Sequence, residues 1–134
     1  MVEVEKSVEL VKVAKVKPFV VAGIPAFNEE KTIARVVLGA QRYVDKVVVC
    51  DDGSSDLTAE IAEHLGADVV HHEKRLGYGA AMRSLFRRAG ELNADVLVTL
   101  DGDGQHEPRE IPGVVRAVVE DGVDVAIGSR FVDE

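Results

Sequence analysis

The chain has no tryptophan and a single cysteine, Cys50, among its 134 residues. One cysteine excludes an internal disulfide framework and is typical of proteins from reducing compartments. No apolar run approaches the roughly 20 residues that cross a bilayer, and residues 1–17 lack the apolar segment of a signal peptide. These absences lead us to expect a cytoplasmic protein, and they leave peripheral attachment to a membrane open.

Basic residues are also scarce, because 16 Lys and Arg stand against 24 Asp and Glu, for a formal net charge of −8. Nucleic-acid-binding domains usually carry a basic surplus, so we expect no nucleic-acid partner. The acidic surplus suits a metal site, and it also suits simple solubility. The length fits one domain with a sizeable core.

Short apolar segments alternate with helical patterns along residues 18–134. Strands are predicted at residues 19–24, 46–50, 68–71, 95–100 and 124–127. Near-continuous apolar strands joined by helices indicate a parallel sheet that is covered on both faces. The sequence therefore predicts an α/β fold with three α/β/α layers and a mainly parallel sheet. Residues 1–17 form a separate N-terminal arm whose pattern fits a strand, a helix or a mobile segment.

Helices are predicted at residues 33–40, 56–65, 78–89 and 108–120. We expect Asn28 to cap the first helix and Gly66 to end the second. The third helix is expected to direct Met82, Leu85 and Phe86 to one face.

Polar segments follow four of the five predicted strands, at residues 25–29, 51–54, 101–103 and 128–130. The carboxyl ends of parallel strands share one edge of the sheet, and ligands bind at that edge. We therefore expect the four segments to form one composite site.

Two aspartates one residue apart, Asp101 and Asp103, follow the strand at residues 95–100. Carboxylate oxygens are ligands that Mg²⁺ and Mn²⁺ favour, and such a metal would neutralise a diphosphate. The alternative is an acidic turn that only closes a strand–helix connection. His106 would lean on the metal site or on an acceptor pocket, or would act as a hydrogen-bonded turn histidine.

The other segments offer further candidates. Asp52 would accept hydrogen bonds from a base or ribose, or would only cap a turn. Gly77 and Gly79 would bring backbone N–H groups to a phosphate, or belong to a plain loop. Arg130 would clamp a phosphate oxygen, or form a surface salt bridge.

The remaining basic and reactive side chains carry weaker functional signals. Lys74 and Arg75 would add positive charge near the glycine loop, or would simply be solvated. Cys50 is expected to be buried and inert. His71 and His72 are assigned no functional role.

Taken in order, these motifs resemble the family 2 glycosyltransferases with the GT-A fold, and within them the dolichyl-phosphate mannose or glucose synthase branch. The matching motifs are Ile24-Pro25-Ala26-Phe27-Asn28-Glu29, Val49-Cys50-Asp51-Asp52-Gly53-Ser54-Ser55-Asp56, Leu76-Gly77-Tyr78-Gly79-Ala80-Ala81, Asp101-Gly102-Asp103-Gly104-Gln105-His106-Glu107-Pro108 and Gly128-Ser129-Arg130-Phe131. The resemblance implies a Rossmann-like nucleotide-diphospho-sugar transferase fold. It also implies an inverting transfer of a hexose from a GDP- or UDP-sugar to a polyprenyl or dolichyl phosphate, or a related acceptor, with Mg²⁺ or Mn²⁺.

The resemblance also implies roles for individual residues. Those that would bind the nucleotide sugar are Pro25, Ala26, Phe27, Asn28, Glu29, Asp52, Gly53, Gly77, Gly79, Asp101, Gly102 and Arg130. The metal ligands would be Asp101, Asp103 and Gln105, and the catalytic residues would be Asp103 and Arg130.

Members of this family continue past the Gly-Ser-Arg segment into an acceptor-binding part, whereas this sequence ends at Glu134. We therefore expect the nucleotide-binding portion of such an enzyme, without its acceptor part. Two alternatives stay open, a non-catalytic nucleotide-binding module and a nucleotidyltransferase that makes a nucleotide sugar. The second usually has a glycine-rich basic loop after its first strand, where this chain has residues 25–29. A homodimer or a partner subunit also stays open.

Overall fold

A computed structural model describes residues 17–121 and 125–127 of the chain. Its sheet consists of β1 (Val20–Ala26), β2 (Lys46–Asp51), β3 (Asp68–His71), β4 (Val96–Thr99) and β5 (Val125–Ile127). The strands lie in the order β3-β2-β1-β4-β5, and every neighbouring pair is parallel. The predicted parallel sheet is thus confirmed, with strand boundaries within two residues of those expected.

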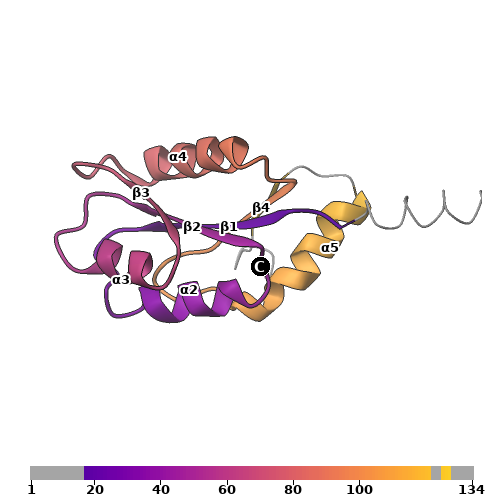
Figure 1. The fold of residues 1–134 in the computed structure, drawn as a ribbon, viewed down its shortest axis with the longest axis horizontal. Coiled ribbons are helices and arrows are strands. Elements are labelled where there is room, and N and C mark those ends of the chain that lie inside the picture. Colours follow the sequence, from indigo (N-terminus) through magenta and orange to yellow (C-terminus); the bar gives the residue numbers. More distant parts are fainter. Residues whose placement is uncertain (1–16, 122–124, 128–134) are drawn as a thin grey trace, which may run out of the picture.

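Helices cover both faces of this sheet (Figure 1). They are α2 (Ile33–Gln41), α3 (Thr58–His64), α4 (Tyr78–Glu91), the short 3₁₀ helix η1 (Pro108–Glu110) and α5 (Ile111–Asp121). Helix α4 lies alone on one face, and α2, α3 and α5 lie on the other. The predicted three-layer α/β/α architecture is therefore confirmed.

The alternation of side chains along β1 explains the two hydrophobic cores. Ala22 and Ile24 point towards the core shared with α2, α3 and α5. Val21 points to the opposite face, where it joins Leu85 of α4. Successive strand residues face opposite sides of a sheet, so an unbroken apolar strand is what a sheet covered on both faces requires.

Two local expectations are wrong. Asn28 does not cap α2, because Thr32 occupies the N-cap position without a side-chain cap, and the Asn28 side chain instead accepts a hydrogen bond from the Ser55 N–H at 2.9 Å. Phe86 is 42% exposed, and the buried stripe of α4 consists of Ala81, Leu85 and Ala89. Gly66 ends α3 as predicted, with a φ of 92° that favours glycine.

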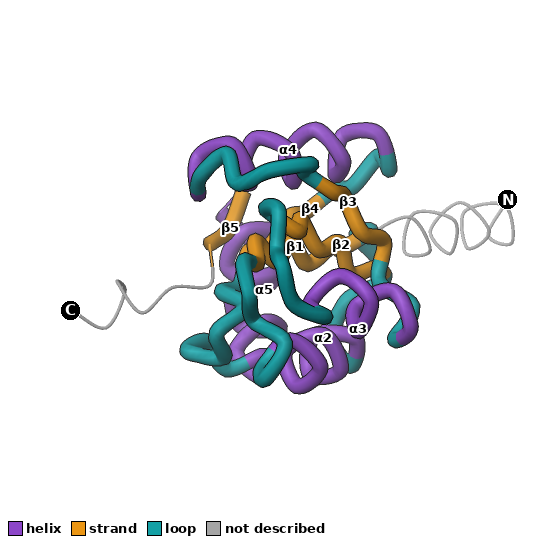
Figure 2. The backbone as a smooth tube through the Cα atoms, turned by 90° about the vertical axis from the view of Figure 1, so that its left-hand side faces the viewer, coloured by secondary structure: helices purple, strands orange, loops and turns teal. Residues whose placement is uncertain are grey.

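The strand order reverses direction between β1 and β4, which are neighbours in the sheet although two strands separate them in sequence. In open parallel sheets, ligands bind outside the carboxyl ends of the strands at this switch point. Figure 2 looks onto that edge, where loops cross in front of the strands. None of the helices that the structure describes has the length and apolar composition needed to span a bilayer.

Candidate functional site

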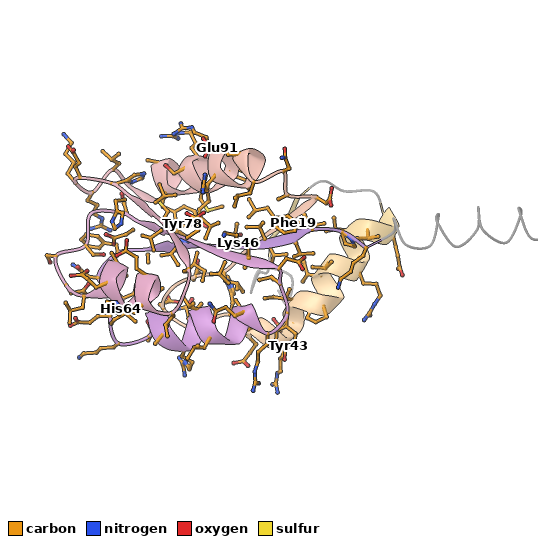
Figure 3. The ribbon with its side chains drawn as sticks, in the orientation of Figure 1. Phe19, Tyr43, Lys46, His64, Tyr78 and Glu91 are labelled. Atoms are coloured by element: carbon orange, nitrogen blue, oxygen red, sulfur yellow. The ribbon has the colours of Figure 1, made fainter. Side chains whose placement is uncertain are left out.

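A cavity of about 310 Å³ lies at the carboxyl edge of the sheet, at the β1–β4 switch point. It is lined by Pro25, Ala26, Phe27, Glu29, Asp52, Arg75, Tyr78, Ala81, Asp101, Gly102 and Asp103. Tyr78, labelled in Figure 3, comes from the first turn of α4. Three of the four predicted polar segments therefore meet here. The fourth, residues 128–130 with Arg130, lies outside the described residues.

The turn that carries Asp101 and Asp103 is held by hydrogen bonds from within and from α2. The Asp101 N–H donates to Nδ1 of His106 at 3.1 Å, and the Gln105 N–H donates to Oδ1 of Asp103 at 3.0 Å. The Thr32 hydroxyl donates to the Gly102 carbonyl at 2.6 Å. His106 is thus a hydrogen-bonded turn histidine, and the turn is fixed against the start of α2.

Gly102 allows this turn to approach β1 closely. A Cβ atom at this position would lie 3.3 Å from both the Ala26 Cβ and the Pro25 carbonyl oxygen. A Cβ at this position would meet these atoms more closely than in an ordinary van der Waals contact, so the turn or its neighbours would have to shift by a few tenths of an ångström. The backbone contact therefore places the two aspartates beside Phe27 and Glu29 in the cavity.

Negative charge dominates the cavity, because Glu29, Asp52, Asp101 and Asp103 line it together with Arg75. Burial raises the pKa of Glu29, the negative charge of Asp103 raises it further, and Asp56 and Asp101 add smaller contributions that the Thr32 hydrogen bond opposes. A divalent cation would relieve this repulsion between carboxylates.

The donor set fits Mg²⁺ or Mn²⁺ only when a ligand shares the coordination. In the described part of the chain, no group of three His, Cys, Asp or Glu side chains is placed to hold a metal by itself. Asp101 and Asp103 line the cavity, whereas Gln105 does not. The Gln105 side chain is exposed. Mg²⁺ commonly takes one or two carboxylates plus substrate phosphates, and this arrangement suits such a shared site.

Asp52 is buried at the end of β2 and organises the loop between β3 and α4. Its Oδ1 accepts hydrogen bonds from Nδ1 of His72 and from the Leu76 N–H, both at 2.8 Å, and its Oδ2 accepts one from the Gly77 N–H at 2.9 Å. Burial alone would raise the pKa of Asp52, but these hydrogen bonds outweigh it and lower the pKa. Asp52 therefore lines the cavity and also positions one of its walls.

His72, for which the sequence predicted no role, has an imidazole that is almost fully buried against Asp52. Nδ1 donates to Asp52, so in the neutral ring Nε2 accepts from the Ser84 hydroxyl at 2.8 Å. The pairing of His72 with Asp52 could have been inferred from the strand register, because Asp51 of β2 is paired with His71 of β3. The residues that follow them, Asp52 and His72, must then leave the sheet side by side.

Cys50 is fully buried, as predicted. Burial first, and then the negative charge of Asp52, raise the pKa of the Cys50 thiol to about 11. The thiol is therefore protonated near neutral pH, and because the thiolate is the reactive form, Cys50 is inert.

Arg75 lies over the Phe27 ring, with its Cζ 4.0 Å from the ring centroid. This cation–π contact places the guanidinium in the cavity wall. Gly53 makes the arrangement possible, because a Cβ there would lie only 2.5 Å from the Lys74 carbonyl carbon. Of the two interpretations of Arg75, the structure favours a charge at the cavity over a purely solvated side chain.

Four of the predicted binding residues, Asn28, Gly53, Gly77 and Gly79, do not line the cavity. Asn28 joins two loops, since its N–H donates to the Ser54 hydroxyl at 2.8 Å. The Gly77 N–H is taken by Asp52, so it is not directed at a phosphate in this structure. Gly79 lies in the first turn of α4.

The sequence profile described as glycosyl transferase family 2 matches residues 22–134. The chain is 35% identical over 126 residues to the UDP-N-acetylglucosamine–dolichyl-phosphate N-acetylglucosaminyltransferase of Methanococcus voltae, covering 81% of this chain and 50% of that protein. It is 36% identical over 117 residues to the dolichol-phosphate mannosyltransferase of Pyrococcus furiosus, covering 81% of this chain and 32% of that protein.

Among solved structures, glucosyl-3-phosphoglycerate synthase from Mycobacterium tuberculosis, in complex with Mn²⁺, UDP and glucosyl-3-phosphoglycerate, is similar in fold. The TM-score is 0.66 at 30% identity, covering 80% of this chain and 42% of that one. The chain spans about half the length, or less, of the first curated relatives that it matches, 46% and 50% for two of them.

Proposed function

The chain belongs to glycosyl transferase family 2, and from that premise we propose that its carboxyl-edge cavity holds a nucleotide sugar for the metal-dependent transfer of a hexose to polyprenyl phosphate or a related acceptor. The observation that carries the proposal is the meeting of Asp101 and Asp103 with Phe27 and Asp52 in one cavity at the switch point. Its volume of about 310 Å³ lies within the range of ligand pockets.

We assign the parts of the donor to parts of the cavity. Phe27 and Asp52, with Pro25 and Ala26 beside them, would bind the nucleoside, either uridine or guanosine. Asp101 and Asp103 would hold Mg²⁺ or Mn²⁺ together with diphosphate oxygens, and Gln105 is proposed as a further ligand. When bound, the metal would stabilise the negative charge on the departing nucleoside diphosphate.

We propose that the transfer inverts the anomeric carbon. An acceptor phosphate oxygen forms the new bond to that carbon from the face opposite the leaving group. The bond to the donor diphosphate breaks, and its electron pair leaves on the diphosphate oxygen. A phosphate oxygen is already ionised at neutral pH, so this acceptor needs little or no general-base assistance. The activities for which the Methanococcus and Pyrococcus relatives are named support a dolichyl-phosphate type of acceptor.

A non-catalytic donor-binding module is the second candidate, because the chain spans about half of its relatives' length. The nucleotidyltransferase alternative is disfavoured, since residues 25–29 contain no basic or glycine-rich sequence. A transfer assay with polyprenyl phosphate separates the first two candidates. Donor binding without product would favour the module.

Isothermal titration with UDP- and GDP-sugars, with and without Mn²⁺, tests donor binding. We expect at least one donor to bind in a metal-dependent manner, and Asp103→Ala to remove that dependence. Glu60→Ala is the matched control, since Glu60 is an exposed carboxylate on α3 that does not line the cavity. The proposal would be overturned if none of the UDP- or GDP-sugars bound in a metal-dependent manner.

A further inference from the structure

A second cavity, of about 260 Å³, lies between α2 and η1. Its lining includes Arg35, Gly39, Arg42, Gly104, Glu107 and Arg109. Tyr43, labelled in Figure 3, marks its edge beyond the end of α2. The segment that follows β4 separates the two cavities, because residues 101–103 line the first and residues 104 and 106–109 line the second.

Close packing of η1 against α2 shapes this second cavity. A Cβ at Gly39 would lie 2.7 Å from the Pro108 Cγ, so the proline ring sits directly on the helix backbone. The arginines Arg35 and Arg42 are seven residues apart on α2 or at its C-terminal cap, which places them about two turns apart on one face. Arg109 approaches from η1. Guanidinium groups from two elements therefore border one groove.

The two cavities have opposite charge. Three arginines line the second, against the single carboxylate of Glu107, which lies 3.6 Å from Arg109. The carboxyl-edge cavity, which we propose for the nucleotide-sugar donor and call the donor cavity, has four carboxylates against one guanidinium among its lining residues. In a chain with a formal charge of −8, a pocket bordered by three arginines is a local reversal that favours an anion.

This second cavity also contacts the turn that carries Asp101 and Asp103. The Arg35 guanidinium lies beside Gly104, where its Nη2 occupies the space that a Cβ would take, and the φ of 81° at Gly104 favours glycine. His106 accepts the Asp101 N–H at Nδ1, so the neutral ring carries its proton on Nε2 as a further donor. Donors of two kinds, guanidinium and imidazole, thus belong to this lining.

We propose that this second cavity binds the phosphate group of a phosphomonoester, separately from the nucleotide sugar. Planar guanidinium groups bind phosphate oxygens through paired hydrogen bonds, and the volume admits a phosphate with part of the group attached to it. The same chemistry is offered by a soluble phosphorylated metabolite and by the headgroup of a lipid phosphate. The inference does not rest on the proposed function, because it uses neither the metal nor the donor.

Titration of the full chain with inorganic phosphate in the presence of EDTA, followed by ³¹P NMR, tests the pocket. We expect saturable binding that Arg35→Gln and Arg42→Gln each weaken about tenfold, the loss typical of a charge-assisted hydrogen bond. Arg87→Gln is the matched control, because Arg87 is exposed on α4 and lines neither cavity. Far-UV circular dichroism checks folding, and Arg109→Gln serves if either α2 variant fails to fold.

Sedimentation with vesicles distinguishes the two sources of phosphate. Binding to phosphatidylcholine vesicles that contain phosphatidic acid, lost in Arg35→Gln but not in Arg87→Gln, would assign the site to a lipid headgroup. Phosphate binding without vesicle binding would assign it to a soluble ligand. The proposal is overturned if neither probe binds, or if Arg87→Gln weakens binding as much as the α2 variants. Nucleotide-sugar binding is measured with metal and without phosphate, so either site can fail alone.

Discussion

Asp52 shows how a single buried carboxylate serves both the fold and the site. Its hydrogen bonds from His72, Leu76 and Gly77 hold the β3–α4 loop, and that loop carries Arg75 over Phe27. A buried carboxylate is tolerated only when such donors satisfy it. The loop and the donor cavity therefore depend on the same group.

The lowered pKa of Asp52 predicts an acid-sensitive contribution to stability. A carboxyl whose pKa is lower in the folded state stabilises the fold above its unfolded pKa, about 3.9 for Asp. This contribution is lost as the pH falls through the folded pKa. Asp52→Asn should lower the free energy of unfolding by about 1–3 kcal/mol at pH 7. Urea unfolding should show the same difference from wild type at pH 7 and pH 5 and a smaller difference at pH 3, and an undiminished difference at pH 3 would contradict the assignment.

Arg75 is the one cation among the described residues that line the donor cavity. If it faces the donor diphosphate, Arg75→Gln should weaken nucleotide-sugar binding about tenfold. The affinity of Arg75→Lys for the nucleotide sugar should lie between those of wild type and Arg75→Gln, because lysine keeps the charge but not the planar stack on Phe27. Titration calorimetry with Mn²⁺ present measures the affinities, with Arg87→Gln as control. Equal affinities for wild type and Arg75→Gln would show that the guanidinium faces solvent in the complex.

At the scale of elements, the cavity depends on loops that cross each other closely. The turn after β2 passes under the β3–α4 loop at Gly53, and the turn after β4 passes against β1 at Gly102. At Gly53 the nearest atoms are backbone atoms of Lys74 and Arg75, whereas at Gly102 they are the Ala26 Cβ, the Pro25 carbonyl oxygen and the Glu29 Cγ. The absence of a side chain at each glycine allows these close crossings. This is why the polar segments meet although they are far apart in sequence.

Gly53 and Gly90 make a matched pair for testing this crossing. Gly53 has a φ of 77°, and a Cβ there would lie 2.5 Å from the Lys74 backbone. Gly53→Ala should therefore destabilise the protein by more than about 1 kcal/mol and weaken donor binding. Gly90 lies within α4 with nothing within 4 Å of an added Cβ, so Gly90→Ala should stabilise the protein by about 0.4–1 kcal/mol. Chemical denaturation measures both, and equal effects of the two changes would contradict the crossing.

The strands and helices were largely predictable from the sequence, because apolar strand segments and the glycines that end helices depend on local sequence. Residues 68–71 form β3 with the predicted bounds. The pairings that failed or were missed depend on contacts between distant segments. Asn28 meets Ser55 of another loop, and His72 meets Asp52 through the strand register. Phe86 is exposed because the face of α4 that packs on the sheet consists of Ala81, Leu85 and Ala89.

For the molecule as a whole, the placement of charge separates two cavities of opposite sign on an acidic protein. Asp101 and Asp103 belong to the negative one, and the arginines of α2 belong to the positive one. The turn between them was predicted as a metal site from its two aspartates alone. The basic cavity could not be predicted, because Arg35, Arg42 and Arg109 come together only when η1 packs on α2.

This arrangement predicts that donor and metal stabilise the whole molecule together. Without a metal, the diphosphate of a nucleotide sugar would face four carboxylates in the donor cavity. Its binding should therefore be weak until a divalent cation offsets the repulsion between these negative charges. At a donor concentration of 100 times Kd, linkage gives about 2.7 kcal/mol, or a rise in Tm of roughly 10 °C for a chain of this size. Thermal unfolding with Mn²⁺ and nucleotide sugar together should show this rise, and either alone should give a much smaller one. Asp103→Ala should abolish the joint effect while Glu60→Ala keeps it, and an equal shift in EDTA would contradict a shared metal–diphosphate site.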